Sequence, residues 1–364
     1  MEICIPLHPV LHPELRELRR ETKVNVNSVR RAAVALAGAA AIAVGVLAAP
    51  AQADPSDFRG LVGVGSDTTQ DVLQGLSDVV IDPDADPSLF LIGSYHATGP
   101  SPIQTRPDTW PNDCTIARPN GSSAGIDALI NDIAQGTDCV DFARSSRGPS
   151  TAGTNLTFVP FAIDGVTWAV RSDSPLAGTN LTRQQLSDIY NCRTTQVGGT
   201  TVNPLVPQAG SGTRTYWLTE LQVPSGALPS CVHDVDTAGQ QVQEHDGSAL
   251  RGAGDIMPYS IAQYIAQANS ASTGVEDRRG AAALQQVNGV APRTAQGTLN
   301  TAFPITRSVY NVFETARLGE FEIDDAFVGS GSQVCADAGA RSTIQRYGFA
   351  LNANCGATNV TGNR

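Results

Sequence analysis

Residues 158–170 read FVPFAIDGVTWAV, and this almost uninterrupted apolar stretch predicts one long buried strand. A second stretch of the same kind, FPITRSVYNVF, covers residues 303–313. Two long strands so far apart in the chain are what two lobes joined by a pair of crossing strands would need. That arrangement places a ligand in the cleft between the lobes.

Shorter segments fill the chain around these two strands. Strand-like runs are expected at 59–64, 89–92 and 139–142, and helices at 123–133 and 182–190, the last opened by a Thr182/Gln185 capping box. Strands that alternate with helices predict an α/β fold with largely parallel sheets. We expect residues 54–165 and 303–364 to form lobe 1, and residues 166–302 to form lobe 2.

Residues 1–53 are expected to be an N-terminal extension plus a secretion signal peptide. Residues 32–49 are small and apolar, Arg30 and Arg31 precede them, and Ala51-Gln52-Ala53 follows them. A charged segment, an apolar segment and an A-x-A site predict cleavage after about Ala53. No cysteine follows that site to carry a lipid, so the mature protein is expected to be secreted and not inserted in a membrane.

Six of the seven cysteines lie after the expected cleavage site, and an even set in an exported chain predicts disulfides. Pairing each cysteine with the next closes three loops of moderate length, so we expect Cys114–Cys139, Cys192–Cys231 and Cys335–Cys355. After the expected cleavage site the chain contains no C-x-x-C and no set of Cys and His residues at the spacing of a metal site. The sequence therefore predicts no metal site and no cofactor.

The charge balance argues against one class of partner. The chain has 364 residues and a net charge of −11, and residues 54–364 alone carry −13. No domain-sized basic surface is available, so nucleic-acid binding is not expected.

Four segments place small hydroxyl residues and glycines between a predicted strand and a predicted helix. They are residues 63–69 (GVGSDTT), 120–125 (NGSSAG), 144–147 (RSSR) and 210–215 (GSGTRT). Glycine lets the backbone approach a ligand closely, and a helix N-terminus offers unpaired N–H groups to an anion. Each segment alone is more typical of an ordinary helix cap, but four in one chain favour a shared anion site.

The order of motifs in this chain resembles that of the phosphate-binding proteins of ABC phosphate uptake. The motifs are these four loops, VDFARSSR at 140–147, the helix after Leu181 and FPITR at 303–307. The similarity runs from about Gly60 to Phe313. It implies a two-lobed type II periplasmic-binding-protein fold with two hinge strands, in which a dehydrated oxyanion is held by hydroxyls, backbone amides and an arginine. An ABC permease would be the partner, and the protein would be a monomer and not an enzyme.

Carried over by position, the resemblance implies that Ser122 binds phosphate and that Ser211, Gly212 and Thr213 wrap it from the second lobe. Ser146-Arg147 matches a Ser-Arg variant of a first-lobe loop. The candidate ligand-binding set is Ser66, Asp67, Thr68, Ser122, Ser123, Ser146, Arg147, Ser211, Gly212, Thr213 and Arg214.

The sequence departs from the family at two positions. Pro207 stands where the family has an arginine, and Asp67-Thr68 replaces the usual Thr-Phe. Arg147, Arg144 and Arg214 are the candidates for the missing cation. Asp67 is the candidate for the missing acceptor of the phosphate proton, and the alternative is that it caps the helix beginning near Thr69.

Two other classes of function stay open at this point. A secreted phosphoester hydrolase would need a nucleophile and a base, and no Gly-x-Ser-x-Gly motif is present. An extracellular interaction protein on the same fold, decoupled from transport, would need no lipid anchor.

Overall fold

The strand expected at 158–170 is β6 (Leu156–Arg171), the longest strand that the structure describes. The structure is a computed structural model that describes residues 54–82, 89–224 and 226–364. The expected signal peptide therefore lies outside the described residues. Along its first half β6 pairs with β14 (Thr306–Glu314), β15 (Ala350–Leu351) and β16 (Thr361–Gly362). Along its second half it pairs with β11 (Asp255–Ser260) and β12 (Ala282–Leu284).

The two long strands lie side by side. β14 is antiparallel to β6, and Arg307 is the register partner of Asp164. The register shifts between Val309 and Tyr310, where Tyr310 pairs with Pro160. Proline has no N–H to give to a ladder, so an irregularity at this point suits it.

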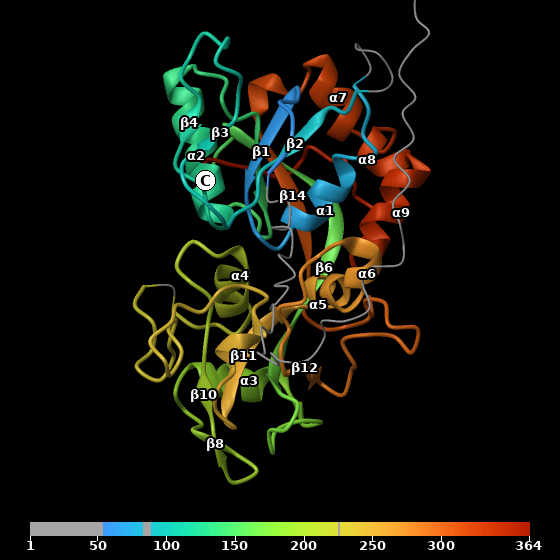
Figure 1. The fold of residues 1–364 in the computed structure, drawn as a ribbon. Helices are drawn as coiled ribbons and strands as arrows, with labels where there is room; N and C mark the ends of the chain where they lie inside the picture. Colours follow the sequence, from blue (N-terminus) through green and yellow to red (C-terminus); the bar gives the residue numbers. More distant parts are fainter. Residues whose placement is uncertain (1–53, 83–88, 225) are drawn as a thin grey trace, which may run out of the picture. The chain divides into compact units, whose positions relative to one another are not determined.

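The main sheet continues on both sides of this pair in the order β10-β11-β6-β14-β5-β1-β2 (Figure 1). The outer members are β1 (Leu61–Gly65), β2 (Ile92–Ser94), β5 (Phe142–Ser145) and β10 (Asn203–Pro204). The pairs β1–β2, β1–β5 and β10–β11 are parallel. The expectation of largely parallel sheets is wrong for the middle, because every pairing of β6 is antiparallel.

Several predicted strands begin later than their apolar runs. β1 starts at Leu61, β2 covers Ile92–Ser94 where 89–92 was expected, and β5 covers Phe142–Ser145 where 139–142 was expected. β5 also ends later than expected, because it includes Arg144, a buried cation that an apolar pattern does not mark.

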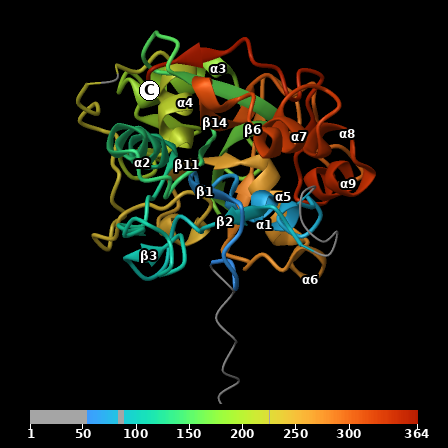
Figure 2. The same cartoon turned by 90° about the horizontal axis from the view of Figure 1, so that it is seen from above.

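Helices cover the two sides of the sheet formed by β1 and β2. In both views α2 lies on one side and α7, α8 and α9 lie on the other, as Figure 2 shows from above. The helices are α1 (Gln70–Leu76), α2 (Ser122–Gln135), α3 (Arg183–Tyr190), α4 (Gly212–Glu220), α5 (Ile261–Ala268), α6 (Ser270–Thr273), α7 (Phe321–Phe327), α8 (Gln333–Ala336) and α9 (Ala338–Arg346). The capping box of Thr182 and Gln185 at α3 is confirmed. None of the helices in the described ranges has the length and apolar character that crossing a bilayer demands.

Short elements fill the loops. They are β3 (Ile103–Gln104), β4 (Thr115–Ile116), β7 (Asn180–Leu181), β8 (Gln196–Val197), β9 (Thr200–Thr201), β13 (Gln286–Val287) and two 3₁₀ turns at Gly247–Ala249 and Thr315–Arg317. The predicted strand–loop–helix order fails at one of the four hydroxyl segments, because residues 144–147 end β5 and lead to β6 without a helix.

The buried side chains form separate hydrophobic clusters. One contains Phe142, Phe313 and Phe327 and draws mainly on the two ends of the described chain. Another contains Trp168 and Trp217 and draws on residues between 166 and 305. The first cluster also takes Ala262, Ala266 and Val275 from α5 and the loop after α6. The exact lobe boundaries stay a prediction.

All three expected disulfides are formed, Cys114–Cys139, Cys192–Cys231 and Cys335–Cys355. Each closes a loop of 20 to 39 residues. A disulfide that closes a loop of this size restricts the unfolded chain and so stabilises the folded protein.

Phe142 is the test of the first cluster. Its ring lies 5.5 Å from that of Phe313 and 5.3 Å from that of Phe327, and Gly63 of β1 leaves the space that the ring occupies. We expect Phe142→Ala to lower the free energy of unfolding by about 3–5 kcal/mol. Phe321→Ala, at a ring that is 57% exposed, is the control and should change it by less than about 0.5 kcal/mol. Urea unfolding followed by circular dichroism measures both, and equal losses would contradict this account of the core.

Candidate functional site

The first and third hydroxyl segments leave the sheet at the same edge. β1 and β5 are parallel neighbours, with Gly65 opposite Arg144. The chain beyond Gly65 and the chain beyond Ser145 therefore emerge side by side, and Ser66 N–H donates to the Arg144 carbonyl at 3.1 Å. The carboxyl ends of parallel strands are where ligands bind in open α/β sheets.

The N-terminus of α2 meets that of α4 at this edge. The N–H of Ser123 donates to the carbonyl of Gly210 at 3.1 Å. A Cβ built on Gly212 would lie 2.3 Å from the hydroxyl oxygens of both Ser122 and Ser146. Those two oxygens are 3.3 Å apart, and Ser122 Oγ accepts from Ser146 N–H at 3.0 Å. Only a glycine at 212 allows the two helix ends to approach this closely.

A second group of hydroxyls lies beside the first. Thr68 Oγ1 and Thr213 Oγ1 are 3.2 Å apart, and both donate to Glu244 Oε2, at 2.7 and 2.9 Å. Ser66 is fully buried, and its hydroxyl has no hydrogen-bond partner among the described residues. The structure thus brings Thr68, Ser122, Ser146, Gly212 and Thr213 of the predicted set into contact.

Arg307 supplies a cation to this region. Its Nη2 donates to Thr213 Oγ1 at 2.8 Å and to Asp164 Oδ2 at 2.9 Å. Its Nη1 is buried and has no hydrogen-bond partner in the part of the chain that the structure describes. A guanidinium in this position can offer one free N–H pair to an anion.

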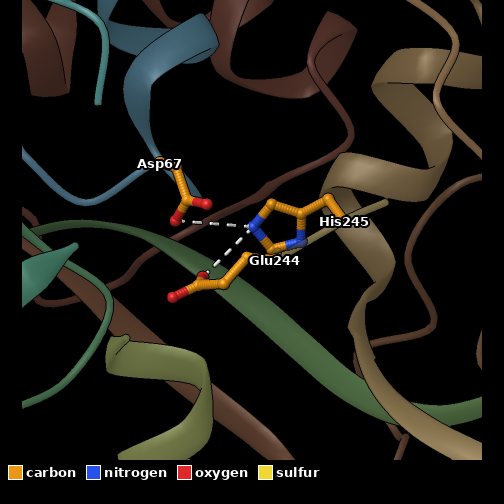
Figure 3. A group of neighbouring side chains, drawn as sticks. All are labelled: Asp67, Glu244 and His245. Atoms are coloured by element: carbon orange, nitrogen blue, oxygen red, sulfur yellow. Dashed lines mark ion pairs between the residues drawn. The ribbon is translucent and has the colours of Figure 1, made fainter. Parts of the chain in front are cut away.

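A buried acid and histidine cluster adjoins the threonines. Figure 3 shows the carboxylates of Asp67 and Glu244 directed at one ring nitrogen of His245. The distances to Nε2 are 3.9 Å from Asp67 Oδ1 and 3.2 Å from Glu244 Oε2. Burial, together with the neighbouring Glu244 charge, raises the pKa of Asp67 well above its usual range. Burial would also raise the pKa of Glu244, but the adjacent His245 ring holds it well below its usual range.

Asp67 does not cap the following helix. The N-cap of α1 is Thr69, and no side chain makes a capping hydrogen bond there. The alternative that the sequence left open for Asp67 is therefore wrong. Its role as an acceptor of a phosphate proton stays a prediction.

The other predicted residues take different places. Ser211 caps α4 by accepting from Arg214 N–H at 2.9 Å. Arg147 Nη2 donates to Ser123 Oγ at 3.1 Å, and Ser123 follows Ser122 of the clustered hydroxyls in the chain.

The three arginines proposed as the missing cation differ in what they bind. Arg214 Nη1 pairs with Asp234 at 2.9 Å, and Arg144 donates to the Gly63 carbonyl and to Ser94. Burial lowers the pKa of Arg144 to about 9. Arg307 donates directly to a hydroxyl of the site, that of Thr213, whereas Arg144 and Arg214 donate to Gly63, Ser94 and Asp234.

Sequence reasoning missed Glu244, His245, Asp164 and Arg307. Asp164 and Arg307 did carry a signal, because each is a charged residue inside a stretch predicted to be a buried strand. Glu244 and His245 carried none, since they lie in a polar segment and 176 residues separate Glu244 from the Thr68 that it binds.

Comparisons with known proteins identify the family. The model of the PBP superfamily domain matches residues 110–328, more than half of the chain. The chain belongs to the PBP superfamily. Its mixed α/β architecture, with β6 and β14 as the joining strands, is the type II periplasmic-binding-protein fold that the sequence predicted.

Two solved structures share this fold. A phosphate ABC transporter substrate-binding protein with bound phosphate from Clostridium perfringens is 15% identical, with a TM-score of 0.52 over 80% of this chain and 99% of that one. An ABC-type phosphate transport receptor from Vibrio cholerae is 17% identical, with a TM-score of 0.50 over 80% of this chain and 100% of that one. No curated protein matches the sequence.

Gly212 offers a test of how tightly the two helix ends pack in this PBP-superfamily member. We expect Gly212→Ala to destabilise the protein by about 1–3 kcal/mol, because the added methyl overlaps two hydroxyl oxygens. Gly319→Ala is the matched control, since nothing lies within 4 Å of its added Cβ. Thermal unfolding measures stability, and small-angle X-ray scattering detects separation of the helix ends. A Gly212→Ala protein identical to the control in both would show that these ends are not in contact in solution.

Proposed function

We propose that this protein is an extracellular solute-binding protein that captures inorganic phosphate or a related oxyanion for ABC-type uptake. The observation that supports it most is the convergence of buried hydroxyls on the N-termini of α2 and α4. Ser66, Thr68, Ser122, Ser146 and Thr213 are each 0% exposed. The hydroxyl of Ser66 has no partner among the described residues, and a buried hydroxyl without a partner is costly. An oxyanion offers several acceptor atoms at once to hydroxyls that lie together.

The donors beside these hydroxyls are of the kind that bind anions. The helix ends of α2 and α4 contribute N–H groups with a partial positive charge. The free Nη1 of Arg307 adds a charge-assisted donor. In this proposal Arg307 takes the role of the arginine that the sequence lacks at Pro207.

The fold is consistent with the proposal. The two solved structures that share it are a substrate-binding protein with phosphate bound and a phosphate transport receptor. At this low identity the likeness supports the fold, and the ligand is argued from the hydroxyls of this chain. The net charge of −13 on residues 54–364 does not oppose it, because affinity comes from short hydrogen bonds inside the site.

Ser122 tests the ligand most simply. Its loss should weaken phosphate binding by about 10- to 150-fold, the equivalent of one hydrogen bond to a charged group, about 1.5–3 kcal/mol. Isothermal titration calorimetry on protein freed of phosphate by unfolding and refolding compares wild type with Ser122→Ala. Ser330→Ala, at an exposed serine of the loop after α7, is the control and should bind like wild type.

Two outcomes would count against the proposal. One is the absence of any heat from wild type with phosphate, arsenate or sulfate at millimolar concentration. The other is an unchanged affinity in Ser122→Ala, which would place the anion elsewhere.

A further inference from the structure

We propose that Asp67, Glu244 and His245 form a binding site for a divalent transition-metal ion of the zinc class. The sequence predicted no metal site, because these residues come from two distant segments. The proposal does not depend on phosphate binding, although the site adjoins the proposed anion site through Thr68 and Thr213.

The donor atoms are close enough to share one ion. One ligand atom from each residue lies within 4.8 Å of the other two. Bonds of about 2.0–2.2 Å to a tetrahedral ion separate two ligand atoms by about 3.3 Å. The Glu244 Oε2 to His245 Nε2 distance of 3.2 Å is already that spacing, and the 3.9 Å from Asp67 Oδ1 requires only a small movement.

The side chains have unused binding capacity. Asp67 Oδ1, Glu244 Oε1 and both ring nitrogens of His245 are buried and have no hydrogen-bond partner among the described residues. The exposed fractions are 3% for Asp67 and 1% for each of the other two residues. Buried polar atoms are normally satisfied, so Asp67 Oδ1 and His245 Nε2, which face each other at 3.9 Å without a hydrogen bond, indicate a missing partner between them.

Charge favours a dication in that position. Two buried carboxylates beside each other repel, and only His245 among the three residues can carry a positive charge. A divalent ion balances both carboxylates and binds the neutral imidazole. One imidazole with two carboxylates suits zinc-class ions, whereas magnesium and calcium prefer sites made of oxygen alone.

The surrounding residues hold His245 in place for this role. Its φ of 55° lies in the left-handed region, which is uncommon for residues other than glycine. The hydroxyl of Tyr259 and the amide of Gln267 both donate to its carbonyl oxygen, at 2.7 and 2.9 Å. These two bonds fix the backbone of His245 and so the position from which its ring extends toward Asp67 and Glu244.

Glu244 is oriented in the same way. The hydroxyls of Thr68 and Thr213 both donate to its Oε2, the oxygen that faces His245 Nε2, and so fix the direction of the carboxylate. The six cysteines of the described chain are in disulfides, so none supplies a competing thiolate there.

The test is a metal titration of the full chain in buffer free of phosphate. Protein stripped with a chelator is titrated with zinc by calorimetry and with cobalt by visible absorption, with magnesium as the comparison. Wild type should bind one ion that His245→Gln does not bind, with an affinity loss of more than about 100-fold, since even outer contacts cost about 10–100-fold. His233→Gln, at an exposed histidine, should bind like wild type.

Circular dichroism of each variant shows whether it folds. Should His245→Gln fail to fold, crystals of the wild type grown with zinc give the same information by anomalous diffraction. The predicted peak lies about 2.0–2.2 Å from His245 Nε2. Equal metal binding by wild type and His245→Gln, or a peak only at other residues such as Cys4, His8 or His12 of the extension, would overturn the proposal. Because no phosphate is present, failure to bind phosphate in the earlier titration does not affect this result.

Discussion

The buried ion pair between Asp164 and Arg307 is the contact on which the rest of the site depends. It joins β6 to β14 at the point where the two long strands run side by side. Asp164 Oδ1 also accepts from Ser260 Oγ and from Ala262 N–H, at 2.9 and 3.1 Å, and so fixes the start of α5. Loss of one partner from such a buried pair destabilises a protein by about 3–5 kcal/mol, because the other charge stays buried and unpaired.

This pair also sets the position of the hydroxyls. Arg307 reaches across to Thr213 at the start of α4, and Thr213 in turn binds Glu244 together with Thr68. One chain of hydrogen bonds thus links the strands β6 and β14, the N-terminus of α4 and the carboxylate of Glu244. Arg307 stabilises the fold and also belongs to the proposed binding site, so a substitution of Arg307 changes both.

The charges of the site stand in apparent conflict. A site with two buried carboxylates is a poor anion site, yet the hydroxyls and the free N–H groups of Arg307 are suited to one. A dication held by Asp67, Glu244 and His245 would remove the conflict by neutralising the carboxylates. The proposed metal and the proposed anion are therefore compatible neighbours, and each is tested without the other.

The sequence predicted the features that depend on local pattern. The long apolar runs marked β6 and β14, the Thr182/Gln185 pair marked the start of α3, and the spacing of the cysteines gave their pairing. It could not place Glu244 or His245, because their partners are chosen by folding across 176 residues in the case of Thr68. It also misplaced β5, since Arg144 is buried among backbone carbonyls and no apolar pattern marks such a residue.

A crystal structure with arsenate, which has the shape and charge of phosphate and scatters anomalously, tests the central claim most directly. We expect one strong arsenic peak between the N-termini of α2 and α4, within hydrogen-bond distance of Ser122 Oγ and Arg307 Nη1. A structure at saturating arsenate with no peak there, or with the anion bound only elsewhere on the protein, would contradict it.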